Sequence, residues 1–151
     1  MLDPIERRRG GSLDHQEHED SQAHQGVSRE VDRLASVIVD AGLKVHRTLG
    51  PGLLESVYEN CLVRELELRG VASRRQVGLP IIYEGMTLEA GFRLDLLVEG
   101  KVIVEVKAVE ALTRLHEAQV LTYLRLSNRR LGLLMNFNVA LFKDGLRRLI
   151  R

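Results

Sequence analysis

Two acidic residues and one lysine lie on two consecutive apolar segments, at a spacing that suits metal-assisted chemistry. Asp95 belongs to the first segment, and Glu105 and Lys107 belong to the second. Side chains alternate along a strand, so Glu105 and Lys107 point to one face. Two neighbouring carboxylates repel each other unless a cation or a shared proton relieves them, and hard oxygen ligands favour Mg²⁺, or Mn²⁺ in its place. A backbone carbonyl such as that of Val106 could add a ligand, and Lys107 could hold a phosphate or help to position and deprotonate a water. Together these groups suit phosphodiester hydrolysis.

The pairing register between the two segments decides whether Asp95 joins this face. A two-residue loop at residues 99–100 would place Asp95 on the valine face and mix apolar with charged side chains on both faces. A three-residue loop at residues 98–100 pairs Leu97 with Lys101 and separates the two kinds of side chain. Because a slip of one residue moves every side chain to the other face, burial favours the three-residue loop.

In the favoured register, Asp95 and Glu105 are diagonal neighbours, close enough for both carboxylates to reach one ion. Arg93 and Lys107 lie on the same charged face, and Gly100 takes a positive φ at the end of the loop. The opposite face is wholly apolar and contains Leu94, Leu96, Val102 and Val104. Alternating charged residues also form ordinary solvated sheet faces. The flanking apolar runs instead indicate central strands, where charged groups need a reason to be present.

Two helical segments carry further polar groups. Glu55 and Tyr58 are three residues apart at the start of the second predicted helix, so they share a face. Glu55 either supplies a further acidic ligand, directly or through water, or merely complements the helix N-terminus. His116, Gln119 and Tyr123 form a polar stripe on the third predicted helix. This stripe suits hydrogen bonds to phosphates, bases or carboxylates, and it also suits a plain solvated face.

The elements that must position these residues follow from periodicity, caps and turns. The predicted helices cover residues 28–48, 53–68 and 113–127, and the predicted strands cover residues 74–83, 86–98, 101–107 and 131–137. The last ten residues before the terminus are predicted to form a hairpin or strand pair around Asp144-Gly145. Pro80 indicates an edge strand or a bulge. The order predicts one α/β domain with helices packed on a central sheet.

Composition restricts the class of protein. Residues 1–27 contain few large apolar side chains and are predicted to be a disordered tail, whereas residues 28–151 form the domain. This domain has nineteen basic and fifteen acidic residues, a mildly basic balance that is compatible with a phosphate backbone. Cys61 is the only cysteine, and no apolar run is long enough to cross a membrane. A cytoplasmic protein is the simplest interpretation.

Several motifs then match a known family in the right order. The segment from Gly52 through Glu55 to Tyr58 resembles the motif that names the GxxExxY proteins, which belong to the PD-(D/E)XK nuclease superfamily. The resemblance spans roughly residues 29–151 and continues through Arg93-Leu-Asp95, Glu105-Val-Lys107, His116, Gln119, Tyr123, the segment LGLLMNF and the closing DGLRRLI. Leu94 departs from the family pattern, which has proline at that position.

The resemblance implies a restriction-endonuclease-like core, in which helices flank a central mixed β-sheet. Asp95 and Glu105 would match the metal-binding acids and Lys107 the catalytic lysine. Glu55 would match the acid from the helix before the sheet. Gln119 and Tyr123 look like the QxxxY element of RecB-type nuclease domains.

Three functions are compatible with these residues. The first is a Mg²⁺-dependent nuclease that acts on DNA. The second is a catalytically silent nucleic-acid-binding module, and the third is a regulator that binds small molecules or proteins on the same fold. The intact acidic pair and lysine favour the first. A domain of this size has little surface to grip a duplex, so a homodimer or a partner protein is expected.

Overall fold

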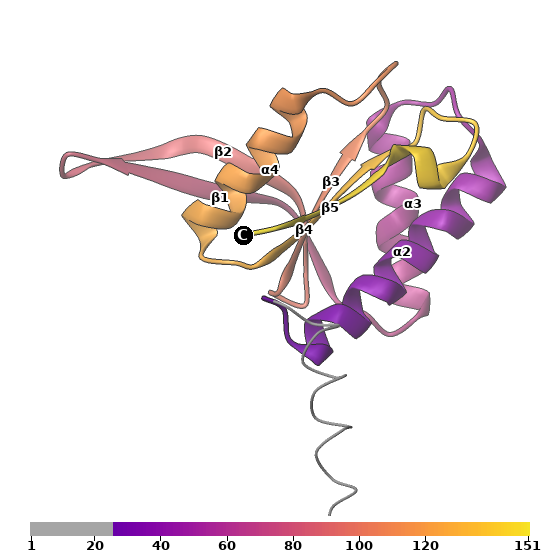
Figure 1. Ribbon diagram of the computed structural model, residues 1–151, viewed down its shortest axis with the longest axis horizontal. Coiled ribbons are helices and arrows are strands. Elements are labelled where there is room, and N and C mark those ends of the chain that lie inside the picture. The colour runs from indigo at the N-terminus through magenta and orange to yellow at the C-terminus, as the bar shows by residue number, and fades with distance from the viewer. Residues whose placement is uncertain (1–25) are drawn as a thin grey trace, which may run out of the picture.

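The computed structural model describes residues 26–151 and shows a layered α/β arrangement (Figure 1). The predicted disordered tail lies outside the described residues except for Gly26 and Val27, and Val27 is buried in the core. The elements in chain order are α2 (Arg29–Leu49), α3 (Glu55–Leu68), β1 (Ser73–Tyr83), β2 (Met86–Val98), β3 (Val102–Lys107), α4 (Arg114–Ser127), β4 (Leu131–Asn136), the short 3-10 helix η1 (Phe142–Gly145) and β5 (Leu146–Ile150).

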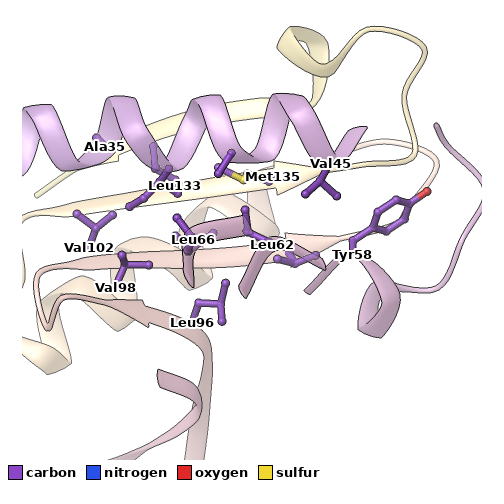
Figure 2. Packing of buried hydrophobic residues seen from close by; sticks show 14 of the residues in the cluster. Ala35, Val45, Tyr58, Leu62, Leu66, Leu96, Val98, Val102, Leu133 and Met135 are labelled. Carbon is purple, nitrogen blue, oxygen red and sulfur yellow. The ribbon is translucent and has the colours of Figure 1, made fainter. Parts of the chain in front are cut away.

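The five strands form one mixed sheet in the order β1-β2-β3-β4-β5. The β3–β4 pair is parallel and is connected through α4, whereas the other pairs are antiparallel. Helices α2 and α3 cover one face, where residues of both helices pack on β2, β3 and β4 (Figure 2). Helix α4 covers the other face. This arrangement confirms the predicted mixed sheet flanked by helices.

Local signals explain where the helices begin and end. Ser28 caps α2 through a hydrogen bond from the Val31 N–H to its hydroxyl. Thr113 caps α4, and Asn128 ends α4 in the left-handed conformation. Strand β1 lies at the sheet edge with a register shift between Leu79 and Ile81, as the proline between them predicts. The β1–β2 hairpin extends as a long arm beyond the helices (Figure 1).

The β2–β3 loop has three residues, as predicted, but it lies one residue later in the chain. Val98 pairs with Val102, so the loop is residues 99–101 and the register differs by two from the predicted one. Val98 is fully buried and therefore belongs in the ladder, whereas Lys101 is exposed in the turn. Glu99 and Gly100 both have positive φ, at 52° and 66°. The predicted positive φ of Gly100 is confirmed.

The predicted assignment of Leu94 to the apolar face with Leu96 is wrong. Leu94 packs against residues of α4, whereas Leu96 packs with α2 and α3. The alternation of side chains along β2 therefore reverses at Asp95, which lies between them. This reversal decides how Asp95 meets β3.

The predicted C-terminal hairpin is also wrong. The segment instead forms η1 followed by a single strand, β5, which pairs with β4. Phe142 is buried among the rings of His46 and Phe137, which holds the chain against the core. A Cβ on Gly145 would lie 2.1 Å from the Asn136 carbonyl oxygen. The chain therefore passes too close to the end of β4 to form the predicted hairpin turn.

Candidate active site

The carboxyl groups of Asp95 and Glu105 meet where the β2–β3 ladder ends. The last ladder pair is Leu96 with Val104, and continuing this register places Asp95 directly opposite Glu105 rather than diagonal to it. The Asp95 N–H donates to Glu105 Oε1 at 3.1 Å, and the Val106 N–H donates to Asp95 Oδ2 at 2.9 Å. Side-chain oxygens thus take the places of backbone carbonyls, and the two carboxyl groups are held together by the backbone of both strands.

Glu105 is an acid in an apolar surrounding. Only 4% of its surface is exposed. Burial raises the pKa of Glu105 to about 9, and the neighbouring charge of Asp95 contributes in the same direction. The Asp95 N–H and the Lys107 ammonium oppose this rise. A buried acid next to a second carboxylate needs either a proton or a cation, and a strongly raised pKa is typical of functional sites.

Lys107 ends β3 on the same face as Glu105, as strand alternation predicts. The valines of β3 pack on the opposite face, against α2 and α3. Lys107 is half-buried, and its ammonium makes no hydrogen bond or ion pair with any other residue in the described range 26–151. Its charge lies close enough to lower the pKa of Glu105, so the ammonium is near the carboxyl pair.

Helix α4 brings Tyr123 to the same site. Tyr123 is buried against the ring of Phe92, with 5.3 Å between ring centroids. Burial raises the pKa of Tyr123, and the charges of Glu105 and Asp95 add to the rise. Gln119, one helical turn earlier, is half-buried on α4. The predicted stripe of Gln119 and Tyr123 therefore lies on the sheet face that carries the acidic pair.

Glu55 reaches the end of β3 but does not join the acidic pair. Its Oε1 accepts the Ala108 N–H at 3.3 Å, one residue beyond Lys107. Within residues 26–151, no three Asp, Glu, His or Cys side chains are close enough together to hold a metal ion. The expectation that Glu55 is a third direct ligand beside Asp95 and Glu105 is therefore not supported by this geometry.

Comparison with known families agrees with this arrangement of the sheet and helices. A family model described as the PD-(D/E)XK nuclease superfamily matches residues 32–149. The chain belongs to the PD-(D/E)XK nuclease superfamily. Searches of curated proteins and of solved structures found no match. The fold is thus the restriction-endonuclease-like α/β fold expected from the motifs. The family suggests a nuclease domain, and nucleases of this superfamily generally use divalent metals.

The PD-(D/E)XK domain uses Tyr58 for structure rather than for substrate contact. Tyr58 is fully buried and stacks on Phe137, with ring centroids 4.6 Å apart. Its hydroxyl donates to the Gly50 carbonyl at 2.6 Å and accepts the Leu53 N–H at 3.1 Å. Tyr58 thereby fixes the turn that leads into Glu55, so its contribution to the site is indirect.

Tyr58→Phe is expected to lower the free energy of unfolding by about 1–3 kcal/mol, because the Gly50 and Leu53 backbone groups lose their partner. Urea unfolding checks this. Tyr83→Phe is the matched control, since Tyr83 is 65% exposed at the hairpin tip. Equal stability of the two variants would contradict the structural role of the Tyr58 hydroxyl.

Two further predicted site residues of the PD-(D/E)XK domain lie elsewhere. His116 completes the α4 capping box, because its Nδ1 accepts the Thr113 N–H at 3.0 Å. Arg93 is exposed on β2. Its neighbours Phe92 and Leu94 both pack towards α4, so alternation places Arg93 on the opposite face from Glu105. The prediction that Arg93 shares the charged face is wrong.

One buried polar residue at this end of the PD-(D/E)XK sheet was not predicted from the sequence. Asn136, at the end of β4, is 1% exposed. Its Oδ1 accepts the Val109 N–H at 3.0 Å, and its Nδ2 donates to the Val109 carbonyl at 2.9 Å. Asn136 thereby holds the segment that follows Lys107. A lone amide within the apolar run LGLLMNF was the signal that could have found it.

Proposed function

We propose that this protein is a Mg²⁺-dependent nuclease of the GxxExxY group that hydrolyses phosphodiester bonds of DNA. The observation that carries the proposal is the Asp95–Glu105 carboxyl pair, held together at a buried strand end with the Lys107 ammonium on the same face. The GxxExxY assignment rests on Gly52, Glu55 and Tyr58 at the spacing of that motif.

The residues at this point suit a hard divalent cation, Mg²⁺ or Mn²⁺. Each carboxyl group gives one oxygen to a backbone N–H, which leaves Asp95 Oδ1 and Glu105 Oε2 without a backbone donor among residues 26–151. Backbone N–H and C=O of one strand residue point to the same side. Because the Val106 N–H points at Asp95, the Val106 carbonyl is the third proposed ligand. Glu55 would act through water from the strand end.

Each group has a distinct proposed part in hydrolysis. A bound Mg²⁺ would supply Lewis-acid stabilisation of the charge that develops on the phosphate oxygens. Lys107 would bind a phosphate oxygen and help to orient the water that attacks phosphorus as the phosphate ester bond breaks. Gln119 and Tyr123 would contact the sugar-phosphate backbone from α4.

A cleavage assay tests this function. The protein is incubated with plasmid DNA, linear duplex DNA, single-stranded DNA and RNA, with Mg²⁺, with Mn²⁺ or with EDTA. We expect cleavage of DNA that requires the divalent ion. Salt-sensitive binding of DNA without cleavage of any substrate would instead support the catalytically silent module. The absence of both binding and cleavage would overturn the proposal.

Two properties of the whole protein belong to the same proposal. No helix in the part of the chain that the structure describes is long and apolar enough to cross a membrane. We place the protein in the cytoplasm, since a single cysteine forms no internal disulfide. We also propose that it works as a homodimer or with a partner protein, because Ile82, Tyr83 and Met86 are exposed together at the tip of the β1–β2 arm.

A further inference from the structure

The side chains of β1 and β2 change faces at the same level of the sheet. On β2, Leu94 packs towards α4 and Leu96 packs towards α2 and α3. On β1, Val77 packs towards α4, whereas Arg75 contacts α3. Residues two apart on a regular strand share a face, so each strand reverses between these two residues. Both reversals fall between the paired levels Arg75–Leu96 and Val77–Leu94.

Gln76 and Asp95 are the residues at this level, and they are the one missing pair in the register that runs from Ser73–Val98 to Leu79–Phe92. Gln76 has a φ of 50°, a backbone conformation that residues other than glycine rarely adopt within a strand. Such a conformation persists only where the surroundings hold it in place, and it is frequent at functional sites. The backbone of Gln76 therefore needs a group that holds it, and Gln76 lies at the same level of the sheet as the reversal at Asp95.

Glu59 of α3 is that group. It is a buried acid, 6% exposed, in a helix that otherwise packs apolar side chains on the sheet. The Gln76 Nε2 donates to both of its carboxylate oxygens, at 3.1 and 3.3 Å. The Arg75 Nε donates to Oε1 at 3.1 Å, which compensates the buried charge. The Glu59 carboxylate thus joins two successive residues of β1 at the point of reversal.

The reversal has a direct consequence for Asp95. Alternation from Leu94 would point Asp95 to one face, and alternation from Leu96 would point it to the other. Asp95 instead directs its carboxylate along the sheet, where Oδ2 accepts the Val106 N–H as a ladder carbonyl would. This placement brings the Asp95 carboxylate beside Glu105 on β3.

We propose that the Glu59–Gln76 contact is the positioning device that holds the β1–β2 reversal and thereby aims the Asp95 carboxylate at β3. Glu59 and Gln76 are positioning residues, since neither contacts Glu105 or Lys107. The geometric part of this inference stands on the fold alone, and its consequence for metal binding rests on the proposed function.

Amide hydrogen exchange and Mn²⁺ titration of the full chain test the inference. Glu59→Leu and Gln76→Leu remove the contact, so the Val106 amide is expected to lose its protection, and Mn²⁺ affinity to fall about ten- to a hundredfold. Gln76→Gly is expected to be affected less than Gln76→Leu, because glycine adopts a positive φ without strain. Glu65→Leu is the matched control, since Glu65 lies on the same helix but pairs with Lys44 and Arg69.

Val106 protection and Mn²⁺ affinity in Glu59→Leu equal to those of Glu65→Leu would overturn the inference. If Glu59→Leu does not fold, the two Gln76 variants decide, and equal losses in both would overturn it. Neither readout needs turnover. A wild-type protein that cleaves nothing would overturn the proposed function but would leave this comparison valid. An active wild-type protein, together with unchanged protection of the Val106 amide in Glu59→Leu, would overturn the positioning role alone.

Discussion

Lys107→Ala is expected to slow DNA cleavage by ~10²–10³-fold, the usual cost of removing one donor that stabilises a charged transition state. Its affinity for Mn²⁺ should stay equal to wild type or rise, because the ammonium is not a ligand and its charge opposes a cation. Asp95→Asn should lose both activity and Mn²⁺ affinity, since Asp95 supplies a ligand oxygen. The two variants therefore separate metal binding from the catalytic step.

Lys101→Ala is the matched control for Lys107→Ala. Lys101 lies just before the other end of β3 and pairs with Glu30 of α2, away from the acidic pair. Single-turnover cleavage rates and Mn²⁺ titrations of the variants provide the measurement. Cleavage by Lys107→Ala at the rate of Lys101→Ala would exclude Lys107 from the reaction.

The second large effect concerns pH and Glu105. Its folded pKa of about 9 lies above the ordinary value of 4.5. Between these values, the folded protein without metal holds a proton that the unfolded chain has released. The stability that this proton contributes is fully present below pH 4.5 and is lost as pH rises towards 9, at up to ~1.4 kcal/mol per pH unit.

Glu105→Gln removes this titration and should flatten the decline. Urea unfolding in EDTA from pH 5 to pH 9 is expected to show the variant gaining stability relative to wild type as pH rises. Glu89→Gln, an exposed position on the β1–β2 arm, controls for the lost charge. A stability difference between Glu105→Gln and wild type that does not change with pH would contradict the buried, protonated state of Glu105.

The helices and strands were predictable because local signals and burial agree. Ser28 and Thr113 are strong helix caps. The valines of β3 alternate with Glu105 and Lys107, as expected for a strand with one apolar face and one charged face. The faces of β3 therefore followed from sequence alone. The C-terminal turn did not, since the close approach of Gly145 to Asn136 depends on a tertiary contact.

The placement of Asp95 could not be predicted from alternation. A strand reversal has no periodic signal, and here it depends on a contact between α3 and β1 from residues 17 positions apart. The roles of Tyr58 and His116 were equally hidden, because a tyrosine or histidine at helical spacing looks the same whether it binds substrate or a nearby backbone group. Only the bonding partners in the folded chain distinguish these cases.

A Mn²⁺ titration followed by electron paramagnetic resonance at pH 9 tests the central claim most directly, that Asp95 and Glu105 together hold a divalent cation. We predict saturable binding of Mn²⁺ by the wild-type protein that is competed by Mg²⁺ and abolished in the double variant Asp95→Asn, Glu105→Gln. Binding by the double variant at wild-type affinity, or no binding by the folded wild-type protein, would contradict it.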